Sequence, residues 1–271
     1  MSRLPAFAFA VLVAATVAAF FITQHLKTST PLLTGSPAPA PAVINPLDGV
    51  TCYSPAARKF VDHRRMQISF YLLNRSDHVD VYVVDTSGRT VATLARGRYM
   101  QGGTHPVRSY FVWDGREANG SVAPDGRYYI KVRLIGARRT VTISNPSGPE
   151  PVDVKTVPPQ PLVTAVVPRV ISHRHLTPVK IDYTGNEGRS ATVVIYRIGR
   201  HGALRGVKTF LTAWASTSTT WDGQIQKRPA SAGRYLIGLQ VTDAACNTGS
   251  FPATGHPRLR TVSHAIVVVR R

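Results

Sequence analysis

Two of the nine histidines stand at a spacing that could bind a metal ion. His173 and His175 flank Arg174, so a β-strand would place both imidazoles on one face as half of a metal site. A complete site needs further ligands, and no cysteine or acidic cluster stands near this pair in the sequence. We therefore expect these histidines to bind no metal.

The sequence holds none of the short motifs that build common active sites. It contains no Gly-x-Ser-x-Gly nucleophile turn, no His-Glu-x-x-His metal motif and no Walker loop for phosphate. A Ser/His/Asp triad could also assemble from distant positions, but no residue pattern points to one. We expect a protein without enzymatic activity, catalytic residues, metal or cofactor.

The chain has two cysteines, Cys52 and Cys246. Cys52 precedes the first long strand pattern, whereas Cys246 lies between the last two strand patterns of the second half. In an immunoglobulin-type topology the loop between the last two strands faces the amino-terminal end of its domain, toward a preceding domain. Because such a pair can oxidise outside the cytoplasm, we hypothesise an interdomain disulfide. Two buried or free thiols are the alternative.

One motif occurs twice, in YFVWDGREANGSVAPDGRYYIKVRL (110–134) and in TTWDGQIQKRPASAGRYLIGLQVTD (219–243). Both copies place Trp-Asp-Gly before a turn region and Gly-Arg-Tyr before an alternating strand pattern, which indicates a duplicated domain. We expect the tryptophan to fill a core and Asp-Gly to form a turn; carbohydrate binding by the tryptophans is the alternative. The motif residues are Trp113, Asp114, Gly115, Gly126, Tyr128, Trp221, Asp222, Gly223, Gly233 and Tyr235.

Short alternating segments bounded by Gly, Pro, Asn and Asp dominate the chain beyond residue 47. We predict an all-β fold with two immunoglobulin-like β-sandwich domains, at 47–145 and 151–271, separated by a segment rich in Pro and Gly. The predicted strands are 67–73, 79–85, 90–95, 110–113, 127–134 and 140–143 in the first domain, and 178–183, 192–198, 207–210, 219–221, 234–242 and 263–269 in the second.

The first half resembles the Ig-like domain of the FlgD family of flagellar hook-capping proteins. The resemblance rests on ISFYL (68–72), VDVYVVDTSGRTVATL (79–94) and WDGREANGSVAPDGRYY (113–129). The second half is similar through its Trp-Asp-Gly and Gly-Arg-Tyr motifs and through VTDAACNTGS (241–250). The resemblance implies tandem Ig-like domains in a bacterial envelope protein with a binding or scaffolding role. It does not imply a flagellar function, since no counterpart of the hook-capping protein's amino-terminal region is present.

The amino terminus contains Arg3 and then an apolar run at 6–22, AFAFAVLVAATVAAFFI. Its length is close to the about 20 residues that span a bilayer, and a secretory signal peptide has a similar pattern. We predict an uncleaved signal-anchor, a transmembrane helix, at 1–27, with a cleaved signal as the alternative. Residues 28–46 are rich in Pro and Ala, which favours an extended linker. Either way, we expect the following domains outside the membrane.

The chain carries 33 basic and 14 acidic residues, a net charge of +19. Residues 158–271 hold 15 of the basic and 4 of the acidic residues, which favours anionic partners for the second domain; biased composition is the alternative explanation. We expect a non-enzymatic cell-envelope binding or structural protein. The alternatives are a basic domain that binds an anionic envelope polymer, or a scaffold for a surface appendage. The expected partners are the membrane, through the amino-terminal segment, and an unknown protein or anionic polymer, with nucleic acid disfavoured.

Overall fold

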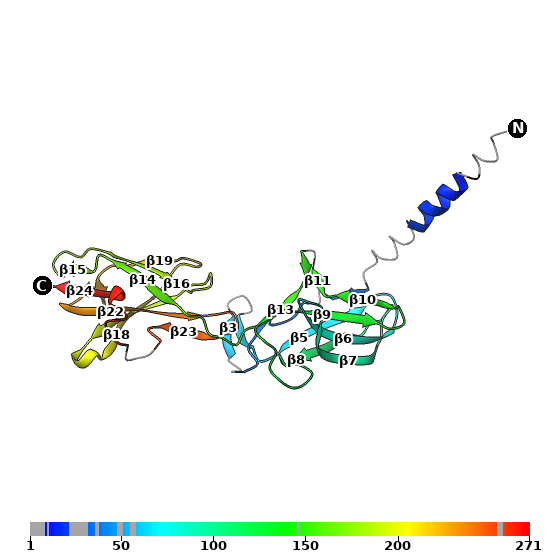
Figure 1. The fold of residues 1–271 in the computed structure, drawn as a ribbon, viewed down its shortest axis with the longest axis horizontal. Coiled ribbons are helices and arrows are strands. Elements are labelled where there is room, and N and C mark those ends of the chain that lie inside the picture. Colours follow the sequence, from blue (N-terminus) through cyan, green and yellow to red (C-terminus); the bar gives the residue numbers. More distant parts are fainter. Residues whose placement is uncertain are drawn as a thin grey trace. The chain divides into compact units, whose positions relative to one another are not determined.

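The structure is a computed structural model, and it describes residues 9, 11–21, 32–35, 38–47, 51–54, 58–145, 147–253 and 257–271. By their contacts the residues form two compact units (Figure 1). Unit 1 comprises Met1–Ala40, Gln67–Trp113 and Tyr128–Pro151, and unit 2 comprises Pro41–Met66, Asp114–Arg127 and Val152–Arg271. Residues 47–66 and 114–127, which the sequence assigns to the first domain, therefore group with unit 2.

Unit 1 is built from antiparallel strands. β5 lies between β1 and β8, while β6 lies between β7 and β9, and β10 also pairs with β9. β11 and β12 form a separate hairpin. The strands are β1 Leu33–Thr34, β5 Met66–Leu72, β6 Asp77–Asp85, β7 Thr90–Met100, β8 Ser109–Trp113, β9 Gly126–Leu134, β10 Arg139–Thr142, β11 Ser144–Asn145 and β12 Gly148–Pro149.

Alternating apolar residues supply the core of unit 1. In β5 the side chains of Ile68, Phe70 and Leu72 are buried, because every second residue of a strand points to the same face. Phe70 stacks on Phe111 of β8, with ring centroids 5.2 Å apart. The pattern that predicted these strands is therefore the pattern that fills the core.

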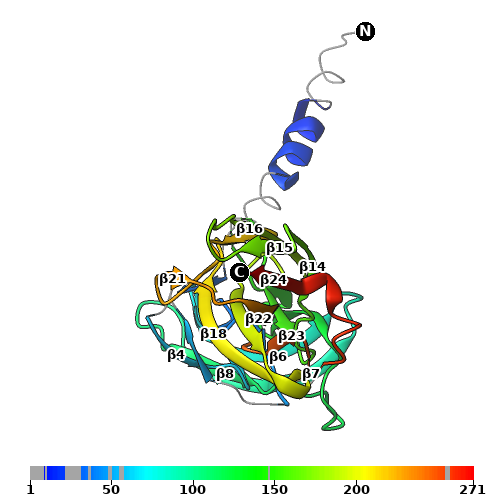
Figure 2. The ribbon, with the colours of Figure 1, turned by 90° about the vertical axis from the view of Figure 1, so that its left-hand side faces the viewer.

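Unit 2 contains a β-sandwich of two sheets. One sheet has the order β14-β16-β19, and the other has the order β15-β24-β22-β17-β18 with β23 also on β22. Figure 2 shows β14 and β16 on one side of this unit and β18, β22 and β23 on the other. Residues of both sheets share one hydrophobic core, including Ile181 and Trp221 from one sheet and Val193 and Tyr235 from the other.

Smaller strands complete unit 2. β2 pairs in parallel with β13, β3 pairs with β4, and β20 pairs with β21. The elements are β2 Val43–Ile44, β3 Thr51–Ser54, β4 Lys59–Asp62, β13 Pro151–Val154, β14 Leu162–Val167, β15 Val170–Ser172, β16 Val179–Thr184, β17 Thr192–Ile198, β18 Leu204–Leu211, β19 Ser218–Trp221, β20 Gln224–Ile225, β21 Arg228–Pro229, β22 Gly233–Thr242, β23 Thr248–Phe251 and β24 Ile266–Arg270, with 3-10 helices η1 Arg200–Gly202 and η2 Ser263–Ala265.

The chain is mostly β, as predicted, but some elements differ from the predicted strands. The segment 263–269 begins with the 3-10 turn η2 and continues as β24. Strand β14 was not predicted. Its exposed ends, Leu162 and Val167, are apolar, and this hides the alternation that marks a half-buried strand.

Part of the predicted linker at 28–46 is paired with strands. Leu33 and Thr34 of β1 lie opposite Leu72 and Tyr71 of β5, and Ala40 forms a bridge with Gln67. Val43 and Ile44 form β2. Within the predicted linker, these residues therefore belong to paired strands, and the pairing satisfies backbone N–H and C=O groups that an edge strand would leave open.

The predicted amino-terminal anchor at 1–27 is described only at residues 9 and 11–21, which are helical. Arg3 and the remainder of that segment lie outside the described residues. Among the residues that are described, no helix is long and apolar enough to cross a membrane.

Candidate functional site

The aromatic residues of the repeated motif lie in the cores. Trp113 is 1% exposed and Trp221 is 0% exposed. Trp113 packs edge-on against Tyr128 with ring centroids 5.1 Å apart, and Trp221 packs against Tyr235 at 5.7 Å. An indole this deeply buried has no face left for a sugar ring, so these tryptophans contribute core packing.

The Asp-Gly pairs of the motif form turns. The backbone N–H of Arg116 donates to Asp114, and that of Gln224 donates to Asp222. The following glycines have φ angles of +74° at Gly115 and +73° at Gly223, which favour glycine. A Cβ atom at Gly115 would also lie 2.7 Å from Cγ of Pro46. The other two motif glycines, Gly126 and Gly233, begin β9 and β22.

The two spaced histidines do not share a strand face. β15 ends at Ser172, so His173 and His175 lie in an exposed bend, and the strand expected there is wrong. The ring Nδ1 of His173 lies 3.0 Å from the carbonyl oxygen of Ala230. In the described part of the chain, neither histidine belongs to a cluster of metal-ligating side chains.

Cys52 and Cys246 form a disulfide, with their Cα atoms 5.9 Å apart. Cys52 lies on β3, and Cys246 lies in the turn between β22 and β23, where its φ is +69°. Both cysteines belong to unit 2, so the bond joins two segments of that unit and is no bond between the two units.

His63 lies beside this disulfide and was not among the candidates from the sequence. It follows β4, the partner of β3, and its side chain is 7% exposed. The ligand atoms of Cys52, His63 and Cys246 all lie within 4.8 Å of one another. Nothing in the sequence pairs His63 with Cys246; the β3–β4 register places it near Cys52, and the disulfide brings Cys246 to both.

A buried polar network surrounds the turn that carries Cys246. Asp243 accepts hydrogen bonds from the backbone N–H groups of Ala245 and Asn247, at 2.8 and 2.9 Å. Lys155 lies 3.4 Å from Asp243 and also pairs with Glu187. Burial lowers the pKa of Lys155, but Glu187 and Asp243 outweigh it, so the net shift is upward. Lys155 therefore acts as a built-in cation that neutralises two carboxylates.

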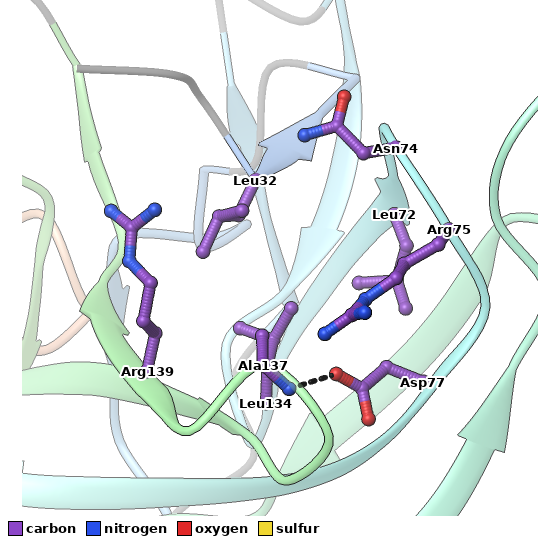
Figure 3. A pocket seen from close by; sticks show the side chains of 8 residues that line it. All are labelled: Leu32, Leu72, Asn74, Arg75, Asp77, Leu134, Ala137 and Arg139. Carbon is purple, nitrogen blue, oxygen red and sulfur yellow. Dashed lines mark hydrogen bonds between the residues drawn. The ribbon is translucent and has the colours of Figure 1, made fainter. Parts of the chain in front are cut away.

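Unit 1 has a pocket of about 270 Å³ beside the turn that follows β9 (Figure 3). Asp77 on its wall accepts backbone hydrogen bonds from His78 and Gly136 at 2.7 Å and from Ala137 at 2.9 Å. Burial raises the pKa of Asp77, but these N–H groups together lower it overall. The charged carboxylate thus holds the turn through these three backbone N–H groups. The lining residues are Leu32, Leu72, Asn74, Arg75, Asp77, Leu134, Ala137 and Arg139.

The four carboxylates of residues 158–271 are all paired with lysines. Asp182 pairs with Lys180 at 2.9 Å, and Asp222 pairs with Lys208 at 2.6 Å. Glu187 and Asp243 share Lys155. Among the described residues, none of the twelve arginines of this segment forms an ion pair with an Asp or Glu side chain. Arg169 and Arg197 donate to the carbonyl oxygens of Ser263 and Ala232, which leaves the positive charge of both without a carboxylate partner and able to attract an external anion.

Two of these arginines border a groove on the larger sheet of unit 2. The groove has a volume of about 330 Å³, and its wall includes Arg169 before β15 and Arg234 on β22. Nearby, Arg197 of β17 lies directly opposite Arg205 of β18. Like charges in opposite positions destabilise a sheet unless an anion lies between them. The end of this sheet is therefore strongly cationic.

Residues 54–137 match the FlgD Ig-like domain. No curated protein matches the chain. Among solved structures, dimeric latent PorU from Porphyromonas gingivalis is 12% identical with a TM-score of 0.29, covering 76% of this chain and 18% of PorU. The calcium binding domain CBD12 of CALX1.1 is 8% identical with a TM-score of 0.27, covering 76% of this chain and 80% of that one. The chain thus spans less than a fifth of PorU, and TM-scores this low support no argument about it.

The residues that match the FlgD Ig-like domain include some of the features described above and exclude others. The FlgD Ig-like segment contains the first Trp-Asp-Gly motif, Asp77 and His63. Cys52 precedes this segment, whereas Cys246 and the arginine groove follow it. The match therefore covers the first copy of the motif, whereas the groove and both cysteines lie outside the matched residues.

Proposed function

We propose that this chain is a non-enzymatic structural or binding protein that displays Ig-like β-sandwich domains outside a membrane. The observation that carries the proposal is the FlgD Ig-like segment in a chain whose regular structure is mostly β-strand. Such a domain suggests a structural or appendage-related role. The second Trp-Asp-Gly and Gly-Arg-Tyr copy supports a tandem arrangement, because Trp221 and Tyr235 pack as Trp113 and Tyr128 do.

A non-enzymatic role agrees with the environment of the perturbed carboxylates. The side chain of Arg64 lowers the pKa of Asp62 to about 2, and Ser87 together with Arg89 lowers that of Asp85 to about 2. Carboxylates held in the charged form by their own loops are unsuited to general acid–base catalysis near neutral pH.

We place the protein in the bacterial cell envelope, anchored by the apolar segment near the amino terminus. The Cys52–Cys246 disulfide supports export, because such bonds persist in oxidising compartments. Separation of membrane and soluble fractions, followed by sequencing of the mature amino terminus, tests this part. Recovery in the membrane fraction with Met1 or Ser2 at the terminus is expected. A soluble product that starts near residue 20 would show a cleaved signal instead, and a cytoplasmic product would contradict export.

The central experiment is a pull-down of the full chain in detergent against fractionated envelope components. We expect specific retention of one envelope protein or polymer, and no turnover with general hydrolase substrates. Retention of nothing above the level of a β-sandwich protein of equal charge would contradict the binding proposal. A scaffold for a surface appendage is a further candidate by analogy with hook capping; loss of an appendage in a deletion strain, restored by the gene, would support it.

The unpaired arginines favour one second candidate, recognition of an anionic envelope polymer by unit 2. Binding of polyphosphate or polygalacturonate should weaken steeply with added salt, whereas neutral dextran should not bind. Arg169→Gln/Arg234→Gln should weaken binding more than Arg65→Gln/Arg96→Gln, which removes the same charge outside the groove. Equal losses in both variants would mean that net charge alone drives binding and that the groove is no site.

A further inference from the structure

Three potential metal ligands lie close together in unit 2, two of them buried and one partly exposed to solvent. Sγ of Cys52, Sγ of Cys246 and a ring nitrogen of His63 lie within 4.8 Å of one another. Cys246 is 3% exposed and His63 is 7% exposed, while Cys52 is half-buried. Two sulfurs and one imidazole form a ligand set that prefers thiophilic cations such as Zn²⁺ or Cu⁺. The half-buried Cys52 leaves an approach from solvent.

The backbone fixes the tautomer of His63. Its Nδ1 lies 2.8 Å from the carbonyl oxygen of Val43. Because a carbonyl oxygen can only accept, Nδ1 must carry the proton, and in the neutral ring the lone pair is on Nε2. Metal-binding histidines are usually oriented in this way, by donating the second ring N–H to a carbonyl or carboxylate. The imidazole of His63 is therefore prepared to act as a ligand through Nε2.

The oxidised cysteines cannot ligate a metal, because both sulfurs are bonded to each other. A dithiol reductant would cleave the bond, giving two cysteine thiols and a cyclic disulfide of the reductant. Each thiol then loses its proton on binding a metal. On a tetrahedral zinc with Zn–S bonds of about 2.3 Å, two sulfurs lie about 3.8 Å apart. This separation requires only a side-chain movement of about 2 Å from the disulfide.

We propose that reduction of Cys52–Cys246 creates a metal site formed by the two thiolates and Nε2 of His63. Three protein ligands leave the fourth tetrahedral position to water or to an external ligand, as in catalytic rather than structural zinc sites. The site is closed while the disulfide persists and opens under reducing conditions. It goes beyond the structural and binding role, which the oxidised chain performs without it.

The test uses the full chain in detergent, reduced with dithiothreitol and freed of reductant under nitrogen. Titration with Co²⁺ should give a near-ultraviolet thiolate-to-cobalt charge-transfer band that saturates at one equivalent and is displaced by Zn²⁺. The oxidised protein should show no band. Absence of the band in the reduced chain would overturn the proposal.

His63→Asn is the decisive variant. The Asn amide can still donate to the Val43 carbonyl, but it lacks an atom in place of Nε2, so Co²⁺ affinity should fall at least about tenfold. His78→Asn, a change outside the three-ligand cluster, should bind as the unmodified chain does. If His63→Asn binds Co²⁺ as tightly as the unmodified chain, binding comes from the thiols alone, in a folded or an unfolded chain, and the site does not exist.

Discussion

Asn45 donates a hydrogen bond from Nδ2 to Oδ1 of Asn247, at 2.6 Å, although the two residues are 202 positions apart in the sequence. Both side chains are buried, at 0% and 4% exposure. Asn247 in turn donates to the carbonyl oxygen of Lys155 and to Asp243. This amide links the segment around β2 to the turn after β22, so we expect it to be a central stabilising contact of unit 2.

Asn247→Ala should lower the free energy of unfolding of unit 2 by about 2–3 kcal/mol, because it leaves several buried polar groups unsatisfied. Urea denaturation followed by circular dichroism measures the change. Asn119→Ala, at an exposed turn, should cost about 1 kcal/mol or less. A double-mutant cycle with Asn45→Ala should show a coupling of at least about 0.5 kcal/mol; simple additivity would contradict the proposed contact.

The disulfide should stabilise unit 2 by lowering the conformational entropy of the unfolded chain. Cys52 and Cys246 are 194 residues apart, and closing so long a loop contributes about 2–5 kcal/mol. Cys52→Ser/Cys246→Ser should therefore unfold at a lower urea concentration than the unmodified chain. Reduction should lower the urea midpoint of the unmodified chain by the same amount and should leave that of the variant unchanged. Titration of the denatured, unreduced chain should give no free thiol; two free thiols would rule the bond out.

The buried tryptophans should dominate the stability of their units. Trp113→Ala and Trp221→Ala each remove a fully buried indole and should cost about 3–5 kcal/mol. Trp214 is 68% exposed and contacts Arg189 through its ring face, so Trp214→Ala should cost less than about 1 kcal/mol. Thermal unfolding of the three variants checks the order. A larger loss for Trp214→Ala than for Trp221→Ala would contradict the core assignment.

The pKa of Asp77 predicts a pH-dependent contribution to the stability of unit 1. Backbone N–H groups lower this pKa against the opposing effect of burial, so the charged carboxylate is favoured in the folded state. The stabilisation of the folded state by this carboxylate is present above the ordinary carboxyl pKa. It is lost as the pH falls through the lowered pKa that Asp77 has in the folded state. Asp77→Asn should cost about 1–3 kcal/mol at pH 7, since an amide NH2 group, which cannot accept a hydrogen bond, replaces one of the two carboxylate oxygens.

Urea midpoints at pH 7 and at about pH 2–3 test this dependence. The difference in urea midpoint between Asp77→Asn and the unmodified chain should become smaller as the pH is lowered. Glu150→Gln, which alters a carboxylate with one hydrogen bond from Asn145, serves as the control and should change stability by less than about 0.5 kcal/mol at either pH. A constant gap for Asp77→Asn would exclude the proposed role of its charge.

Local patterns were sufficient for the fold class. Ile68, Phe70 and Leu72 alternate with polar or half-buried neighbours, and this period of two is a property of the strand itself. The turn at Asp114-Gly115 is equally local, because its side-chain acceptor and its permissive glycine are adjacent in the chain. Such features require no knowledge of which strands pair.

Tertiary structure decided the composition of the sites. His63 becomes a candidate ligand only because the β3–β4 register and the turn after β22 bring it to Cys52 and Cys246. The basic composition was visible in the sequence, but which cations remain unpaired was not. Lysines form the ion pairs with the four carboxylates of residues 158–271, and Arg169 and Arg234 at the groove have no acidic partner among the described residues. Ion pairs and ligand clusters depend on distances between segments far apart in the chain, and those distances exist only once the strands have paired.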